Sequence, residues 1–74
     1  MKRRQLLRQL ADIARICGVE FDKDRPAHGG AHDKFAIGRY FVEVPRHREL
    51  NEYTARGILR NFETICNVVS KEDG

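Results

Sequence analysis

The sequence predicts an α+β domain of the order α-β-β-β-α, in which two helices cover one face of a three-stranded antiparallel sheet. Two observations lead to this class. Apolar residues recur at helical spacing near both ends of the chain, and residues 33–44 alternate between apolar and polar side chains around a two-residue turn. A chain of 74 residues forms one small domain, because it can bury only a thin core of two layers.

The first helix is expected over residues 3–17, where an apolar stripe is formed by Leu6, Leu7, Leu10, Ile13, Ala14 and Cys17. Gly18 is suited to end this helix in a left-handed cap. Lys2, Arg3 and Arg4 stand at the positive end of the helix dipole, which costs roughly 0.3–1 kcal/mol per exposed charge. We therefore expect a frayed N-terminus, unless a partner compensates for these charges.

The chain after the first helix is expected to form a short strand and then a loop. Residues 19–23 alternate as a strand does, whereas Pro26, Gly29 and Gly30 favour a loop over residues 24–30.

A hairpin is predicted from two strands, residues 33–37 and 40–44, joined by Gly38-Arg39. Glycine in the first position of a two-residue turn is typical of type II′. The resulting register places one apolar set of side chains against the helices, namely Phe35, Ile37, Tyr40, Val42 and Val44. The opposite face then carries His32, Lys34, Ala36, Phe41 and Glu43. His32 is thus expected to point away from the core, which argues against a packing role.

The second helix is expected to begin after Asn51, a typical N-cap, and to bury Ala55, Ile58, Leu59, Phe62, Ile65 and Cys66. Gly57 lies inside it at a cost of about 1 kcal/mol relative to alanine, which suggests an exposed position or a close backbone contact. We expect one domain over residues 1–69 and a disordered tail over residues 70–74.

The charge is unevenly distributed along the chain. Residues 1–48 hold 11 Lys and Arg against 6 Asp and Glu, whereas residues 49–74 hold 3 against 5. A basic first half favours a polyanionic partner such as nucleic acid, although a merely solvated basic surface explains the charge equally well. No apolar run approaches the ~18 residues that span a bilayer. We therefore expect a soluble, cytoplasmic protein without a membrane partner, with Cys17 and Cys66 as reduced core side chains.

The candidate chemistry is limited by the few reactive side chains. A metal site needs three or four converging ligands, and His28, His32 and His47 are not joined by cysteines or carboxylates at a recognisable spacing. The only serine, Ser70, lies in the expected tail, which argues against a Ser/His/Asp triad. We therefore expect neither a metal nor another cofactor.

A single exposed histidine beside basic residues suffices for ribonuclease chemistry. RNA supplies its own nucleophile, the 2′-OH, so the enzyme needs only to move protons and to stabilise a charged phosphorane. His32 can transfer the proton, because imidazoles titrate near neutral pH. Lys34, Arg46 and Arg48 can stabilise the phosphorane, and Gly30 lets backbone approach a phosphate closely.

Three segments resemble the HicA toxin family of type II toxin–antitoxin systems. They are GAHDKF (30–35), VEVPRHREL (42–50) and TARGILRNF (54–62), and their order and spacing agree with the family's G-S-H-H-x-F, V-P-x-H/P-x-x-x-L and G-T-L-R-x-I-L-K. The resemblance implies a double-stranded-RNA-binding-domain-like fold and a ribosome-independent mRNA interferase. It also implies that His32 is the catalytic residue and that a HicB-like antitoxin binds the toxin and blocks this histidine.

Three positions depart from the family pattern: Ala31 replaces the serine, Asp33 the second histidine and Tyr53 the glycine. Asp33 leaves open an altered specificity or a role in positioning His32. The sequence thus supports two hypotheses, a ribonuclease toxin that uses His32 and a catalytically inactive RNA-binding module of the same fold that holds A-form RNA by its shape and phosphates.

Overall fold

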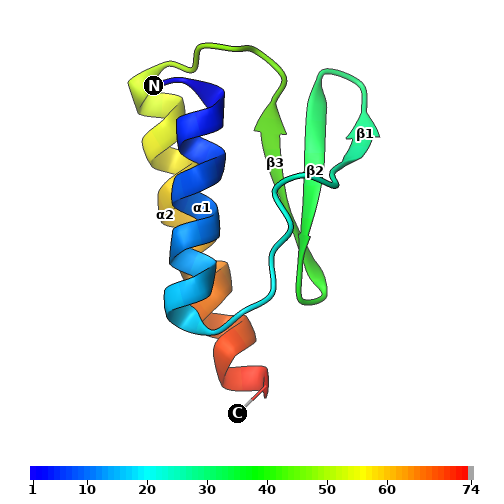
Figure 1. The fold of residues 1–74 in the computed structure, drawn as a ribbon, viewed down its shortest axis with the longest axis vertical. Coiled ribbons are helices and arrows are strands. Elements are labelled where there is room, and N and C mark those ends of the chain that lie inside the picture. The colour runs from blue at the N-terminus through cyan, green and yellow to red at the C-terminus, as the bar shows by residue number, and fades with distance from the viewer. Residues whose placement is uncertain (74) are drawn as a thin grey trace.

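The computed structural model describes residues 1–73 and has the predicted order of elements (Figure 1). These are α1 (Arg3–Cys17), β1 (Ala27–Gly29), β2 (His32–Ile37), β3 (Tyr40–Pro45) and α2 (Glu52–Asp73). The strands form one antiparallel sheet in the order β1-β2-β3, and the paired helices lie on one side of it. The predicted α+β class is therefore confirmed.

The N-terminus of α1 is held in place, so the expected fraying is wrong. Lys2 forms an isolated β-bridge with Glu49, and the Met1 ammonium lies 2.9 Å from the Leu50 carbonyl oxygen and 3.2 Å from the Glu49 carboxylate. The chain that precedes α2 thus accepts a hydrogen bond from the Arg3 N–H of the first turn and pairs with the Met1 ammonium. At the other end, Gly18 has φ 73° and caps the helix as predicted.

The first strand of the chain, β1, does not lie where the sequence pattern indicated. Residues 19–23 form no strand, because their apolar side chains pack irregularly over the core: Val19 is buried, and the Phe21 ring centroid lies 5.0 Å from that of Phe62. The chain instead enters the sheet at Ala27–Gly29, inside the segment expected to be a loop. A two-residue turn at Gly30-Ala31 then pairs β1 with β2.

The β2–β3 hairpin has the predicted register, with Ile37 opposite Tyr40 and Phe35 opposite Val42. Gly38 has φ 60°, as a type II′ turn requires of its first residue. The helix-facing side of the hairpin buries Phe35, Ile37, Val42 and Val44, together with one polar residue, Asp33. The outward face carries His32, Lys34, Ala36, Phe41 and Glu43, all of which are exposed, as predicted.

Helix α2 begins as predicted, because the Asn51 side chain accepts a hydrogen bond of 2.7 Å from the Tyr53 N–H. Gly57 lies on its exposed side. The helix continues to Asp73, so residues 70–73 are helical and not the expected disordered tail; Gly74 lies outside the described residues. Packing explains this length, since Val69 is buried and the Glu72 carboxylate pairs with Arg39 at 3.3 Å.

The two thiols are free, with Cys66 buried and Cys17 half-buried. Burial, with a smaller contribution from the neighbouring Cys17, raises the pKa of the Cys66 thiol to about 11. Over residues 1–73, no helix has the length and apolar character needed to cross a bilayer.

Candidate functional site

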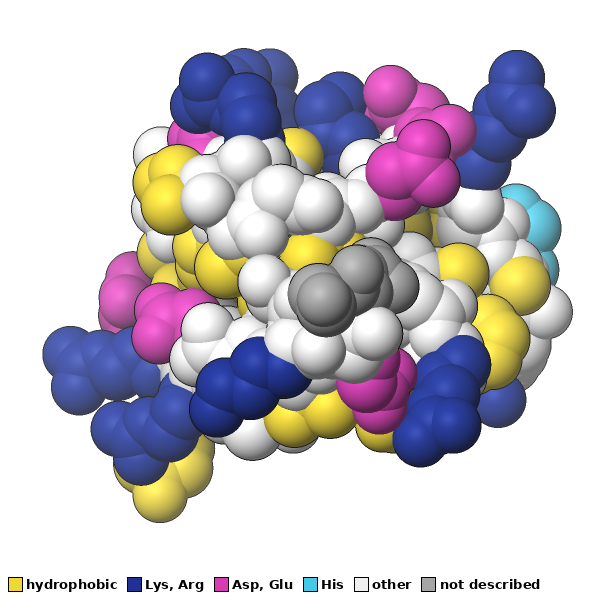
Figure 2. Space-filling model, turned by 90° about the horizontal axis from the view of Figure 1, so that it is seen from below, with side chains coloured by type: hydrophobic (Ala, Val, Ile, Leu, Met, Phe, Trp, Pro, Cys, Tyr) yellow, Lys and Arg dark blue, Asp and Glu magenta, His cyan; other side chains and the backbone are white. Residues whose placement is uncertain are grey.

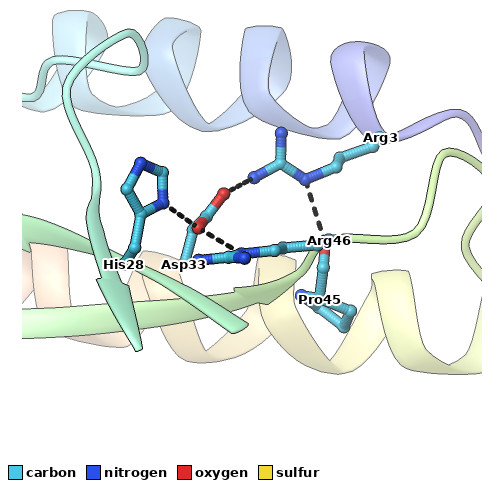
Figure 3. Close-up of polar contacts among 5 residues, drawn as sticks. All are labelled: Arg3, His28, Asp33, Pro45 and Arg46. Carbon is cyan, nitrogen blue, oxygen red and sulfur yellow. Dashed lines mark hydrogen bonds and ion pairs between the residues drawn. The ribbon is translucent and has the colours of Figure 1, made fainter. Parts of the chain in front are cut away.

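Asp33 is the buried polar residue around which the candidate site is built. It lies on the helix-facing side of β2, two residues before the buried Phe35, and 6% of its surface is exposed. Its Oδ1 accepts hydrogen bonds from His28 and Arg46, and its Oδ2 accepts one from Arg3 (Figure 3). One carboxylate therefore joins α1, β1 and the chain that follows β3.

These contacts keep the Asp33 carboxylate ionised. The hydrogen bond to His28, followed by the hydrogen bond to Arg46 and its positive charge, lowers the pKa of Asp33 below the ordinary carboxyl value, although burial acts in the opposite direction. Asp33 thus carries a permanent negative charge at neutral pH.

His28 is oriented by this charge. Its Nδ1 lies 2.7 Å from Asp33 Oδ1, and because an ionised carboxylate can only accept hydrogen bonds, Nδ1 carries the proton. Among residues 1–73, Nε2 of His28 has no hydrogen-bond partner, and the side chain is 68% exposed. In the neutral Nδ1–H tautomer, Nε2 is a proton acceptor that faces solvent, which suits general acid–base chemistry.

Arg3 fastens the first turn of α1 to the end of the sheet. Besides its ion pair with Asp33, its Nε donates a hydrogen bond of 2.9 Å to the Pro45 carbonyl oxygen (Figure 3). Its guanidinium lies 6.0 Å from the centroid of the Phe35 ring, and its backbone N–H donates to the Arg48 carbonyl at 2.8 Å. The positive charge of Arg3, which is unfavourable beside the helix dipole, is therefore compensated by the buried Asp33 carboxylate.

A basic groove adjoins this cluster. It has a volume of about 620 Å³ and lies between the start of α1 and the chain after β3, lined by Lys2, Arg3, Arg4, Leu7, Arg46, Arg48 and Glu49. Five of these seven side chains are basic, and Arg3 and Arg46 also contact Asp33. The opposite end of the molecule, where α2 finishes, is less uniformly basic than the groove. Basic and acidic side chains are mixed around its rim (Figure 2).

The structure brings together some of the predicted site residues and separates others. Arg46 and Arg48 line the basic groove. Lys34 lies on the outward face of the sheet, 3.9 Å from the Glu43 carboxylate, which offsets its charge. Gly30 has φ 63° and occupies the first position of the β1–β2 turn, so that a side chain there would be strained by the backbone rather than by lack of space.

His32 also lies on the outward face, exposed, at the start of β2. Its side chain forms no hydrogen bond or ion pair with other residues in the range 1–73. The suggested role of Asp33 in positioning His32 is wrong, because adjacent residues of a strand point to opposite faces. Asp33 positions His28 instead.

Sequence reasoning missed the pairing of His28 with Asp33, although a signal was present. Gly30 is the first residue of a two-residue turn, as Gly38 is, and such a turn makes Gly29 and His32 partners and places His28 opposite Asp33. Assigning the whole segment to a loop hid this register.

Among residues 1–73, no three His, Cys, Asp or Glu side chains are grouped so that they could hold a metal ion. Comparison of the chain with protein-family models, curated proteins and solved structures finds no match.

Proposed function

We propose that this protein is a metal-independent endoribonuclease, the toxin of a type II toxin–antitoxin system similar to HicA, which cleaves mRNA in the cytoplasm without the ribosome. The observation that carries this proposal is the convergence, at one end of the sheet, of a groove with five basic side chains and a glycine turn flanked by two exposed histidines. Two of the segments that resemble the HicA motifs, residues 30–35 and 42–50, contribute residues to this turn and this groove.

The basic groove supports a polyanionic substrate. Arginine side chains bind phosphate through directed N–H donors, and those of Arg46 and Arg48 lie at one edge of the groove. The Arg46 N–H donates a hydrogen bond of 3.2 Å to the Ala31 carbonyl, which ties this edge directly to the glycine turn. A phosphate chain held in the groove would therefore run toward the turn and its histidines.

His32 is the catalytic residue in this proposal. It follows the turn directly and faces solvent, so an RNA strand can bring its 2′-OH and the adjacent phosphodiester to the site without displacing core side chains. Attack by this hydroxyl on the adjacent phosphorus requires proton transfer, for which an imidazole is suited near neutral pH.

The inhibitory partner in this proposal is a HicB-like antitoxin that covers the outward face of the sheet. Phe41 is 58% exposed on this face, which also carries His32 and Lys34. An exposed aromatic side chain among polar neighbours provides an anchor for a protein partner.

The test is induced expression in bacteria of the wild type and of His32→Ala, with His47→Ala as the matched control. His47 is also exposed but lies outside the turn and the sheet. Wild type and His47→Ala should arrest growth and degrade mRNA even when translation is blocked, and folded His32→Ala should do neither. Growth arrest by folded His32→Ala would contradict the assignment of His32.

RNA binding without cleavage by the purified wild-type protein would instead favour the catalytically inactive RNA-binding module. This outcome is measured by gel shift and product analysis on the same RNA, so that binding and cleavage are separated.

A further inference from the structure

We propose that His28 is a second catalytic residue of the proposed ribonuclease and that Asp33 is its positioning residue. This inference rests on the proposed function and adds to it a group that the HicA-like motifs do not include. A ribonuclease that cleaves through the 2′-OH needs two proton transfers, one from the attacking oxygen and one to the leaving oxygen. A single histidine leaves one of these transfers to water.

The geometry at His28 is that of a histidine held for proton transfer. Asp33 fixes the Nδ1–H tautomer through a 2.7 Å contact and leaves Nε2 directed away from the cluster (Figure 3). Arg3 and Arg46 also pair with the Asp33 carboxylate and hold it in place beside the ring. In the Nδ1–H tautomer that Asp33 selects, Nε2 is the ring atom that can accept a proton.

The positions of the two histidines suit the geometry of the reaction. His32 directly follows the Gly30-Ala31 turn and pairs with Gly29 on the other strand. His28 is the residue before Gly29, so the two histidines flank the turn. Their side chains leave the sheet on opposite faces, because Gly29 and His32 share one face and His28 and Asp33 share the other. Displacement at phosphorus places the attacking and leaving oxygens in line on opposite sides. A phosphate at the turn would thus have one imidazole on each side.

The step balances without a further reactant. The 2′-oxygen forms a bond to phosphorus while His28 Nε2 accepts the hydroxyl proton. The bond from phosphorus to the 5′-oxygen breaks, and the departing oxygen receives a proton from the imidazolium of His32. The products are a 2′,3′-cyclic phosphate and a 5′-hydroxyl. Arg46, which lies beside both Asp33 and the turn, stabilises the charge that develops on the phosphorane.

The experiment measures cleavage of a defined oligoribonucleotide by the purified protein and four variants across pH. The variants are His28→Ala, His28→Asn, His32→Ala and Asp33→Glu. Asparagine places its amide nitrogen where His28 has Nδ1, so it can keep the hydrogen bond to Asp33 but lacks Nε2. Because His28 is exposed on an edge strand, its variants should remain folded, as far-UV circular dichroism will show.

Both His28 variants should lower kcat by roughly 10²–10⁴-fold while RNA affinity stays within a few fold, because general acid–base groups contribute about that much. The wild-type pH–rate profile should be bell-shaped, and each histidine variant should lose one limb. Asp33→Glu should keep a bell-shaped profile with a lower maximum, since a carboxylate remains beside the ring.

The failures of the two proposals are distinguishable. No cleavage by the wild type would contradict the ribonuclease function itself. Wild-type rates and an unchanged pH profile for folded His28→Ala and His28→Asn, with His32→Ala inactive, would overturn the role of His28 and leave the function standing. Loss of RNA binding in the His28 variants would make His28 a binding contact and would equally overturn its catalytic role.

Discussion

At the residue scale, Asp33 links the stability of the fold to the geometry of the site. It is a buried carboxylate that contacts two guanidinium groups and an imidazole, and these contacts come from parts of the chain as far apart as Arg3 and Arg46. Removing such a charge leaves its partners uncompensated, which is more harmful than the loss of an exposed ion pair. The side chain that orients His28 therefore also fastens α1 to the sheet.

The pH dependence of stability follows from the lowered pKa of Asp33. A carboxyl group with a lower pKa in the folded state contributes stability that is present above its unfolded pKa, near 3.8, and lost as the pH falls through the folded value. The wild-type free energy of unfolding should therefore decline below about pH 4. In urea titrations between pH 2 and 7, Asp33→Asn should be less stable at neutral pH and should lack this component of the decline. Parallel profiles for the two proteins would contradict the assignment.

At the element scale, two glycines in different environments should respond differently to replacement by alanine. One lies in a turn with a positive φ and the other inside a helix. Gly38 has φ 60°, and a Cβ added there would lie 2.8 Å from Cγ2 of the buried Val69. Gly57 lies within α2, and a Cβ added there would meet no atom within 4 Å. The same substitution should therefore have opposite effects on stability at the two positions.

Gly38→Ala should destabilise the fold by roughly 1–3 kcal/mol through overpacking, with about 1 kcal/mol more from the left-handed backbone. Gly57→Ala should stabilise it by up to about 1 kcal/mol, since alanine favours a helix interior. Because 1 kcal/mol corresponds to about 4–8 °C in a domain of this size, thermal unfolding resolves both changes. A rise in Tm for Gly38→Ala would contradict the contact between the turn and α2.

The helices and the central hairpin could be predicted from the sequence because their signals are local. The 3.6-residue stripes, the alternation around Gly38 and the Asn51 cap each lie within a few residues of the structure that they determine. The segment over residues 19–23 shows the limit, because its alternating pattern reflects packing onto Phe62 rather than a sheet.

At the scale of the whole molecule, the site is made by contacts between distant segments. The pair Arg3–Asp33 spans 30 residues, and no periodicity of either segment predicts it. Arg46 and Arg48 could be proposed as phosphate ligands from charge alone, but the groove exists only because the start of α1 meets the chain after β3. The contribution of Lys2, Arg3 and Arg4 was hidden for this reason.

RNA binding should depend steeply on salt if the groove holds phosphates, since each contact releases counterions. Arg4→Ala combined with Arg48→Ala removes two groove side chains and should reduce the slope of log K against log[salt] by roughly 1–2. The matched control is Arg56→Ala with Arg60→Ala, two exposed arginines of α2 outside the groove, which changes the net charge equally. Equal slopes for the two double variants would show that only overall charge matters.

The proposed mechanism requires that the RNA supplies the nucleophile, while the protein moves protons and stabilises the charge on the phosphorane. Its direct test is the cleavage of two matched oligoribonucleotides in EDTA, one of them with a single 2′-deoxy nucleotide at the cut site, with product ends identified by mass spectrometry. The all-ribose RNA should be cut in EDTA to a 2′,3′-cyclic phosphate and a 5′-hydroxyl, and the deoxy RNA should resist cleavage. Cleavage of the deoxy RNA, or activity that EDTA abolishes and magnesium or manganese restores, would contradict it.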